Sequence, residues 1–98
     1  MSYRVQVRTQ VRQFMATLGP ESRSRITRAL RALESEEGDR LALKEALCGY
    51  HRLRVGPYRV VYRYLPGKII KCVFAEERSL IYHLFERDFL KRLRHEGE

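Results

Sequence analysis

The residues of this sequence that could do chemistry are arginines, and they alternate along one stretch, Tyr50–Tyr64 (YHRLRVGPYRVVYRY). Alternate side chains of a β-strand share a face. Gly56-Pro57 suits the turn of a β-hairpin, because glycine tolerates the positive φ of the first turn position. Folding the stretch there predicts that Arg54 lies opposite Arg59. One face of the ribbon then carries Tyr50, Arg52, Arg54, Arg59 and Arg63, with no acidic residue from the stretch among them.

We expect that an anion completes this arginine-rich face. Like charges directly opposite each other on a strand pair are destabilising, on the order of 0.2 to 1 kcal/mol, and arginine binds phosphate through paired N–H donors. The cluster could stabilise the extra negative charge that forms when an RNA 2′-hydroxyl attacks its neighbouring phosphate. Arginine is a poor base, because its pKa lies above about 12. Another group must therefore move the proton, and the candidates are Tyr82, His51, His83, Glu76 and Glu77.

Other site chemistries find little support in the sequence. A G-x-S-x-G nucleophile motif is absent, and Cys48 with His51, like Cys72 with His83, lacks the paired spacing of a zinc site. We expect neither a metal nor a cofactor. Two cysteines are too few for a disulfide framework, so both are expected to be buried free thiols.

Charge points to the partner. The chain of 98 residues has a net charge of +8, and sixteen of its twenty cations are arginine. This composition favours nucleic acid as the partner, with an acidic protein as the second choice. No apolar run approaches the ~18 residues of a membrane span, and the first residues lack a signal-peptide core, so we expect a cytoplasmic protein.

The elements before the hairpin are predicted from apolar spacing. Residues 3–7 (YRVQV) alternate as a short strand that could lie at a sheet edge. A helix is expected from Thr9, as N-cap, to Gly19, and a second from Pro20 to Gly38. Their apolar stripes are Val11, Phe14, Met15 and Leu18 in the first helix, and Ile26, Ala29, Leu30 and Leu33 in the second.

The second helix also carries a run of arginines outside its apolar stripe. Such a run is usually a solvated face, and the alternative is a nucleic-acid contact. The candidate RNA-binding residues on this helix are Arg23, Arg28 and Arg31. Tyr50 and Arg63 of the hairpin are candidates as well.

The remaining elements complete the fold. Residues 41–47 predict either a last helical turn or a loop, with the leucines under the sheet. Residues 68–75 (KIIKCVFA) have the pattern of an interior strand, and one extra residue in the loop before them would place Lys71 on the arginine side. From Ser79 the spacing favours a C-terminal helix. We therefore expect one α+β domain spanning residues 1–98, with the order β-α-α-β-β-β followed by that helix.

The run from Leu47 to Tyr64 (LCGYHRLRVGPYRVVYRY), a hydrophobic strand and then Glu77 to Tyr82 (ERSLIY) resemble the signature region of the RelE/ParE superfamily of toxins from type II toxin–antitoxin modules. The resemblance covers nearly the whole chain and favours the RelE-like branch. It implies a ribosome-dependent endoribonuclease that enters the A site and cuts mRNA without a metal. By position it implies Arg52, Arg54, Arg59 and Tyr82 as catalytic residues, and we add Arg78 as the nearest cation to a further arginine position of the family.

Two departures keep other functions open. The first two basic positions of the family hairpin are often lysine, and a position that often holds arginine is Glu76 here, so that Arg78 would have to substitute. The alternatives are a ParE-like inhibitor of DNA gyrase and a non-catalytic basic module that binds nucleic acid. Either toxin implies a cognate antitoxin, expected to pack on the C-terminal helix through Phe85, Phe89 and Leu90.

Overall fold

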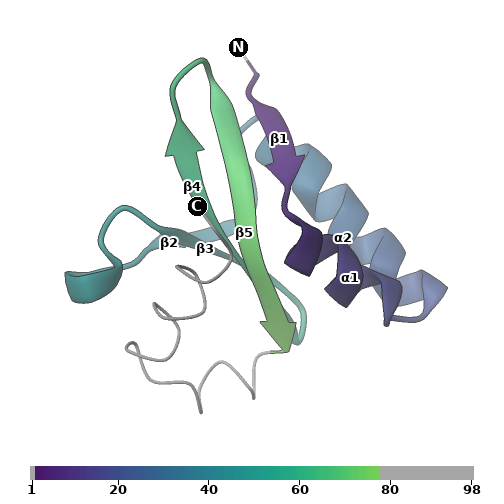
Figure 1. The fold of residues 1–98 in the computed structure, drawn as a ribbon. Helices are drawn as coiled ribbons and strands as arrows, with labels where there is room; N and C mark the ends of the chain where they lie inside the picture. Colours follow the sequence, from purple (N-terminus) through teal and green to yellow (C-terminus); the bar gives the residue numbers. More distant parts are fainter. Residues whose placement is uncertain (1, 78–98) are drawn as a thin grey trace.

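The computed structural model describes residues 2–77 (Figure 1). Its elements are β1 (Arg4–Val7), α1 (Thr9–Ala16), α2 (Pro20–Leu33), β2 (Asp39–Ala42), a short 3₁₀ helix (Glu45–Leu47), β3 (His51–Val55), β4 (Tyr58–Leu65) and β5 (Ile69–Glu77). The predicted α+β class is confirmed. The predicted C-terminal helix lies outside the described residues. No helix among residues 2–77 is long and apolar enough to cross a membrane.

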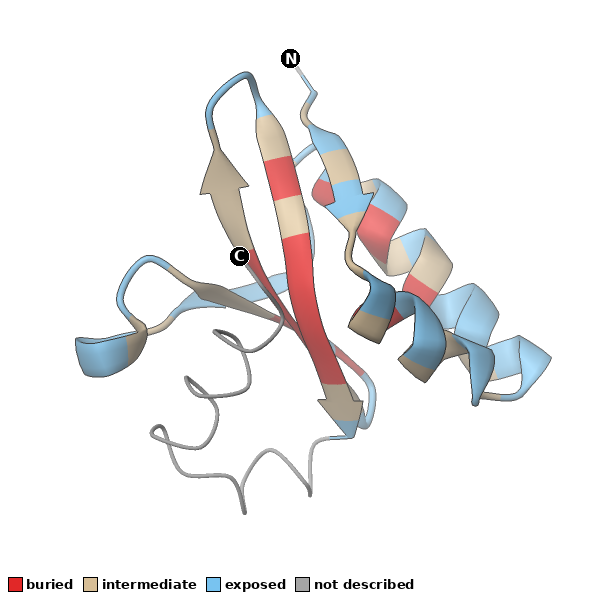
Figure 2. Ribbon diagram, viewed as in Figure 1, coloured by how far each residue is buried: buried red, intermediate tan, exposed pale blue. Residues whose placement is uncertain are grey.

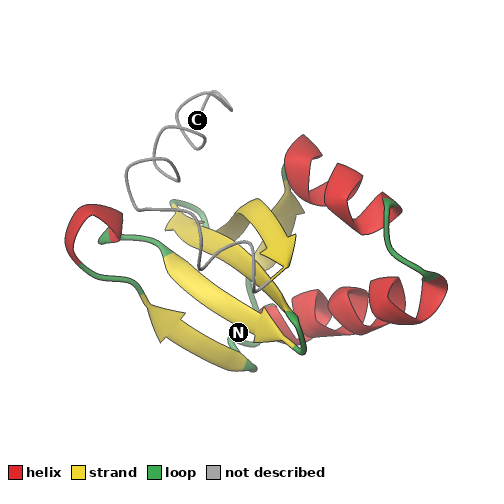
Figure 3. Ribbon diagram, turned by 90° about the horizontal axis from the view of Figure 1, so that it is seen from below, coloured by secondary structure: helices red, strands yellow, loops and turns green. Residues whose placement is uncertain are grey.

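The five strands form one mixed sheet in the order β1-β5-β4-β3-β2. β1 runs parallel to β5, and the other neighbouring strands are antiparallel. β1 lies at an edge and β5 is interior, as predicted. The two helices cover one face of this sheet (Figure 3).

The main core lies between the helices and the sheet face that they cover, here called the helix-covered face. The predicted helical stripes are confirmed: Val11 of α1 and Ile26, Leu30 and Leu33 of α2 are buried. The sheet residues in this cluster are Leu53, Val55, Val60, Tyr62, Ile70, Cys72 and Ala75. Buried positions accordingly fall on the interior strands and on the inner side of α2 (Figure 2).

Helix ends differ from the sequence-based expectation. α1 begins at Thr9, but its N-cap is Arg8, whose backbone is extended and whose N–H donates to the Cys72 carbonyl (3.0 Å). The ladder between β1 and β5 thus holds Arg8 outside the helix. α1 ends at Ala16 and α2 at Leu33, each before the glycine expected to end it. After α2, the backbone turns through positive φ at Glu36 (56°) and Gly38 (128°).

The central hairpin folds as predicted. β3 and β4 pair with Arg54 opposite Arg59 and Arg52 opposite Val61, and Gly56 has the expected positive φ of 58°. Leu65 pairs with Ile69, which leaves three residues in the second loop, as expected from its extra residue. Lys71 is consequently opposite Arg63.

A β-bulge interrupts β5 and was not foreseen. Val61 pairs with Phe74 and Tyr62 with Cys72, so that Val73 is an extra residue on β5. Val73 and Phe74 are both buried with Val61 in a second cluster, separate from the helix-packed core. Beyond the bulge the alternation is shifted by one residue, which places Glu76 opposite Arg59. Alternation in a sequence does not reveal where a strand departs from it.

Strand β2 was also missed. The helical turn or loop expected from residue 41 is wrong for Leu41 and Ala42, because they belong to β2, which pairs with β3. All four residues of β2 are exposed, and Leu41 is 54% exposed instead of lying under the sheet. Leu43 and Leu47 do pack against the second cluster. A short strand exposed on both faces leaves no hydrophobic alternation to detect.

Candidate nucleic-acid interface

Four arginines of the hairpin share the sheet face that is not covered by the helices. Arg54 and Arg59 are direct partners across β3 and β4, and Arg52 pairs with Val61, which belongs to the second cluster. Alternation places Arg63 on the same side, opposite Lys71 of β5. We call this the arginine face, defined by Arg52, Arg54, Arg59, Arg63 and Lys71.

The arginines are fixed to different degrees. The side chain of Arg52 is only 13% exposed, whereas Arg54 is exposed. The guanidinium of Arg63 lies over the ring of Tyr50, with its carbon 5.7 Å from the ring centroid, a cation–π contact. Arg54 can therefore reach a bound ligand directly, while Arg52 is largely buried and contributes mainly its positive charge.

Two carboxylates also lie on this face, so the sequence-based picture of a face with almost no negative charge is wrong. Asp39 of β2 forms an ion pair with Arg52, with Oδ1 3.2 Å from Nη2. Glu76 of β5 is the direct partner of Arg59 on the ladder. Asp39 was missed, because β2 has no clear sequence signal. Glu76 was predicted as a candidate proton carrier, but its position opposite Arg59 was not, because the bulge that orients it has no clear sequence signal either. On strands β2 to β5, five cations against these two carboxylates still leave an excess of three positive charges.

The other RNA-binding candidates lie in the helical layer. Arg23, Arg28 and Arg31 are exposed residues of α2, which packs on the helix-covered face. The structure therefore does not bring them together with the arginine face, since the sheet separates the two sets. Arg23 donates from Nη1 to the Leu18 carbonyl (3.3 Å), a contact that holds it close to the turn between the helices.

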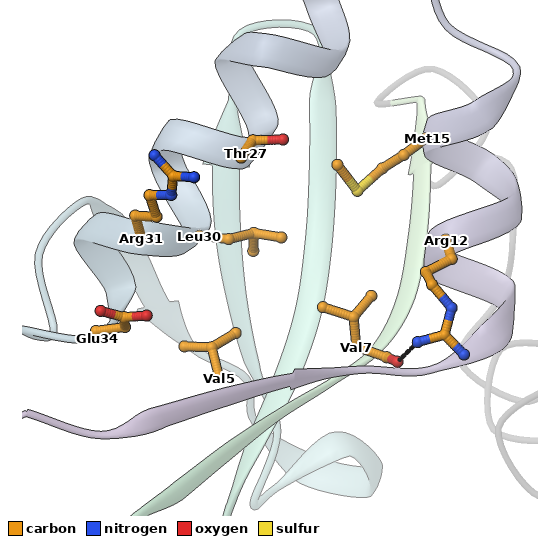
Figure 4. A pocket seen from close by; sticks show the side chains of 8 residues that line it. All are labelled: Val5, Val7, Arg12, Met15, Thr27, Leu30, Arg31 and Glu34. Atoms are coloured by element: carbon orange, nitrogen blue, oxygen red, sulfur yellow. Dashed lines mark hydrogen bonds between the residues drawn. The ribbon is translucent and has the colours of Figure 1, made fainter.

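An open groove of about 470 Å³ lies in the helical layer (Figure 4). Its apolar walls come from β1, α1 and α2, and two guanidinium groups stand at its rim. Its lining residues are Val5, Val7, Arg12, Met15, Thr27, Leu30, Arg31 and Glu34. Arg12 donates from Nη1 to the Val7 carbonyl (2.8 Å). The groove adds no residue to the arginine face.

The candidate proton carriers are also divided between the two faces of the sheet. His51 lies on the helix-covered face, where its ring stacks on Tyr62 (5.2 Å between centroids) and meets Tyr64 edge-on (5.1 Å). Burial, and secondarily the charge of Arg40, lowers the pKa of His51. Glu77 is the ladder partner of Tyr58, a residue of the helix-covered side. Glu76 is the candidate on the arginine face within residues 2–77.

Several predicted site residues lie outside the described residues. These are Arg78, Tyr82 and His83 among the candidates for catalysis, and Phe85, Phe89 and Leu90 among those for antitoxin binding.

The cysteines are not a reactive pair. Cys72 is buried, and burial raises the pKa of its thiol to about 12. Cys48 is exposed, contrary to the expectation that both are buried, because it follows the 3₁₀ helix at the protein surface. Within residues 2–77, no three His, Cys, Asp or Glu side chains come together in a way that could hold a metal ion.

Comparison with solved structures identifies the fold. The chain is similar to a chain of the archaeal RelE–RelB complex of Pyrococcus horikoshii, with 29% identity, a TM-score of 0.66, and coverage of 80% of this chain and 97% of that one. It is also similar to a chain of the RelBE2 toxin–antitoxin complex of Mycobacterium tuberculosis, with 21% identity, a TM-score of 0.68, and coverage of 80% and 100%.

A third similar structure is a mutant of the Escherichia coli toxin RelE in its free state, with 18% identity, a TM-score of 0.66, and coverage of 94% of this chain and 98% of that one. No protein-family model matches the chain, and no curated protein matches it either. The chain is RelE-like in fold, which confirms the resemblance first recognised in its hairpin.

Proposed function

From this RelE-like fold, we propose that the chain is the toxin of a type II toxin–antitoxin module and acts as a ribosome-dependent, metal-independent endoribonuclease. It would cut mRNA by attack of a 2′-hydroxyl on the neighbouring phosphate and so inhibit translation in the cytoplasm. The fold supports the toxin class, and the residues of the arginine face support the reaction.

The observation that carries the reaction is the juxtaposition of Arg54 and Arg59 on paired strands. Two guanidinium groups on adjacent positions of a rigid ladder can bind the non-bridging oxygens of one phosphate. The extra negative charge of the pentacoordinate transition state strengthens these contacts, and stabilisation that increases in the transition state accelerates the reaction. In this proposal Arg54 and Arg59 hold the scissile phosphate.

Other residues complete the mechanism. Arg52 and Arg78 assist charge stabilisation or positioning, and Tyr82 orders the nucleotide or moves a proton. Tyr50 and Arg63 offer a stacked aromatic and cationic pair at one end of the face, suited to a neighbouring nucleotide. Glu76, the ladder partner of Arg59, is a further candidate for proton transfer.

An antitoxin belongs to the same proposal. The similar chains from Pyrococcus horikoshii and Mycobacterium tuberculosis come from toxin–antitoxin complexes. A cognate antitoxin would bind this chain, with Phe85, Phe89 and Leu90 as its proposed contacts. The net charge of +8 would speed association with an acidic partner more than it would fix the final affinity.

Expression of the Arg59→Ala variant tests the proposed reaction. Loss of one transition-state donor typically slows a reaction about 10²- to 10³-fold, so induction of the variant should no longer arrest growth, whereas the wild type should. Mapping of mRNA ends after induction should show new cut sites for the wild type alone. The control is Arg12→Ala, which removes the same charge from the helical layer and should retain toxicity. Full toxicity of the Arg59 variant would exclude the arginine face as the reactive site.

The carboxylates of the arginine face keep a second function in view. Asp39 and Glu76 lower the positive charge that this face offers to RNA. A toxin that binds a protein target instead of RNA would tolerate this loss of charge. Such a ParE-like toxin would inhibit DNA gyrase. Pulse labelling separates the two, because a nuclease should stop protein synthesis first, and a gyrase inhibitor should stop DNA synthesis and induce a DNA-damage response. Absence of any growth phenotype would favour a non-catalytic basic module.

A further inference from the structure

The ion pair between Asp39 and Arg52 joins two strands on the arginine face. Asp39 is the first residue of β2, directly opposite Arg54 on the ladder and diagonal to Arg52. Its Oδ1 lies 3.2 Å from Nη2 of Arg52. The two side chains differ in exposure: Asp39 is 58% exposed and Arg52 is 13% exposed.

Arg52 has few alternatives to this carboxylate. Its Nε is buried and has no hydrogen-bond partner among the described residues. Arg54 lies two residues along the same strand and face, so the like charges favour rotation of the Arg52 guanidinium away from the row. The carboxylate of Asp39 opposes that rotation, since its Oδ1 lies within 3.2 Å of the terminal nitrogen Nη2.

Asp39 has two opposite effects on a bound phosphate. Its negative charge weakens the attraction of the face for RNA, but the carboxylate is mostly in solvent, where water and salt screen it. Its contact with Arg52 fixes a largely buried cation, and electrostatic stabilisation of a transition state depends on charges that are already in position. The difference in exposure indicates that the second effect dominates the reaction.

We propose that Asp39 is a positioning residue of the nuclease: it holds Arg52 in the place from which that charge stabilises the scissile phosphate. The inference rests on the function proposed above and assigns a role to β2, which lies beside the hairpin and supplies no arginine to its row. Asp39 need not touch the substrate.

The test is Asp39→Asn in the full chain, measured by single-turnover cleavage of mRNA on programmed ribosomes at increasing toxin concentration. The maximum rate should fall about tenfold, because misplacement of a group by about 1 Å can cost up to 10²-fold. The toxin concentration that gives half this rate should stay the same or fall, because a negative charge has been removed. Asp39→Glu should recover most of the rate, and Glu37→Gln, which removes an exposed carboxylate just before β2, should behave as the wild type.

A maximum rate for Asp39→Asn equal to or above that of the wild type would overturn the inference, because simple removal of charge would then explain everything. Absence of cleavage by the wild type would instead overturn the proposed nuclease. The positioning contact is then tested by itself, from the heteronuclear ¹⁵N NOE of the Arg52 Nε–H, assigned with Arg52→Lys. Lower values in Asp39→Asn would support the contact, and unchanged values would overturn it.

Discussion

The two faces of the central hairpin come from the same short stretch, yet they solve opposite problems. On the helix-covered face, Leu53 and Val60 are almost completely buried in an apolar core. On the other face, Arg54 and Arg59 stand opposite each other. One face gains stability by removing apolar surface from water, and the other gives some of it up by bringing like charges together.

The difference teaches how a small domain can hold an unfavourable arrangement of charge. A flexible loop would let the guanidinium groups move apart, whereas a ladder fixed by packing on its other side keeps them at strand spacing. If this is correct, changes on the buried face should act on stability, and changes on the arginine face should act on the reaction. Three measurements would break or sharpen that division.

Leu53→Ala should give the largest effect. Leu53 lies between Arg52 and Arg54 in sequence and is 1% exposed on the buried side. Truncation of a buried leucine destabilises a protein by about 2 to 5 kcal/mol, and urea unfolding would measure the loss. The control is Leu41→Ala on the neighbouring strand, where the leucine is 54% exposed and the change should stay within about 0.5 kcal/mol. Equal losses would show that the buried face does not support the hairpin.

Arg59→Lys should have a smaller effect, confined to the reaction. Lysine retains the charge but lacks the planar pair of donors that can bind two phosphate oxygens, so mRNA cleavage should fall about tenfold while the urea midpoint is unchanged. Arg12→Lys, the same substitution in the helical layer, should leave cleavage as in the wild type. Unchanged cleavage in Arg59→Lys would mean that only charge matters on this face.

The smallest effect concerns His51 and pH. Burial lowers the pKa of His51 in the folded chain below its ordinary value of 6.5, so below that pH the unfolded chain binds more protons than the folded one. Stability should therefore decrease as the pH falls through 6.5. His51→Phe retains a ring to stack on Tyr62 but cannot titrate. Urea unfolding at pH 7.5 and 5.5 should show a smaller loss for this variant, and equal losses would assign the dependence to other groups.

The sequence was sufficient wherever a pattern extended over several residues. Alternation in the hairpin predicted the pairing of Arg54 with Arg59, and helical spacing predicted that Ile26, Leu30 and Leu33 are buried. Both patterns are set by the division of side chains between core and solvent, which local sequence records directly.

The parts that could not be predicted depend on neighbours distant in sequence. β2 is exposed throughout, so its pairing with β3 leaves no mark in its own residues. The N-cap of α1 is set by a hydrogen bond from Arg8 to Cys72, far along the chain. Asp39 could not be predicted as part of the site for the same reason. Its contact with Arg52 depends on β2 lying beside β3, and the four residues of β2 do not reveal that pairing.

The extra residue of β5 has a consequence for transferring this surface to another protein. Because Val73 bulges out of the ladder, Glu76 lies opposite Arg59. If the same residues alternated regularly from Lys71, Ala75 would lie opposite Arg59 instead. A graft of β3 and β4 alone would carry the guanidinium groups without the carboxylate opposite Arg59. A graft onto a regular third strand would put the wrong side chain there. The irregular strand β5 must therefore be transferred together with β3 and β4 if the other protein is to have both the guanidinium groups and the carboxylate opposite Arg59.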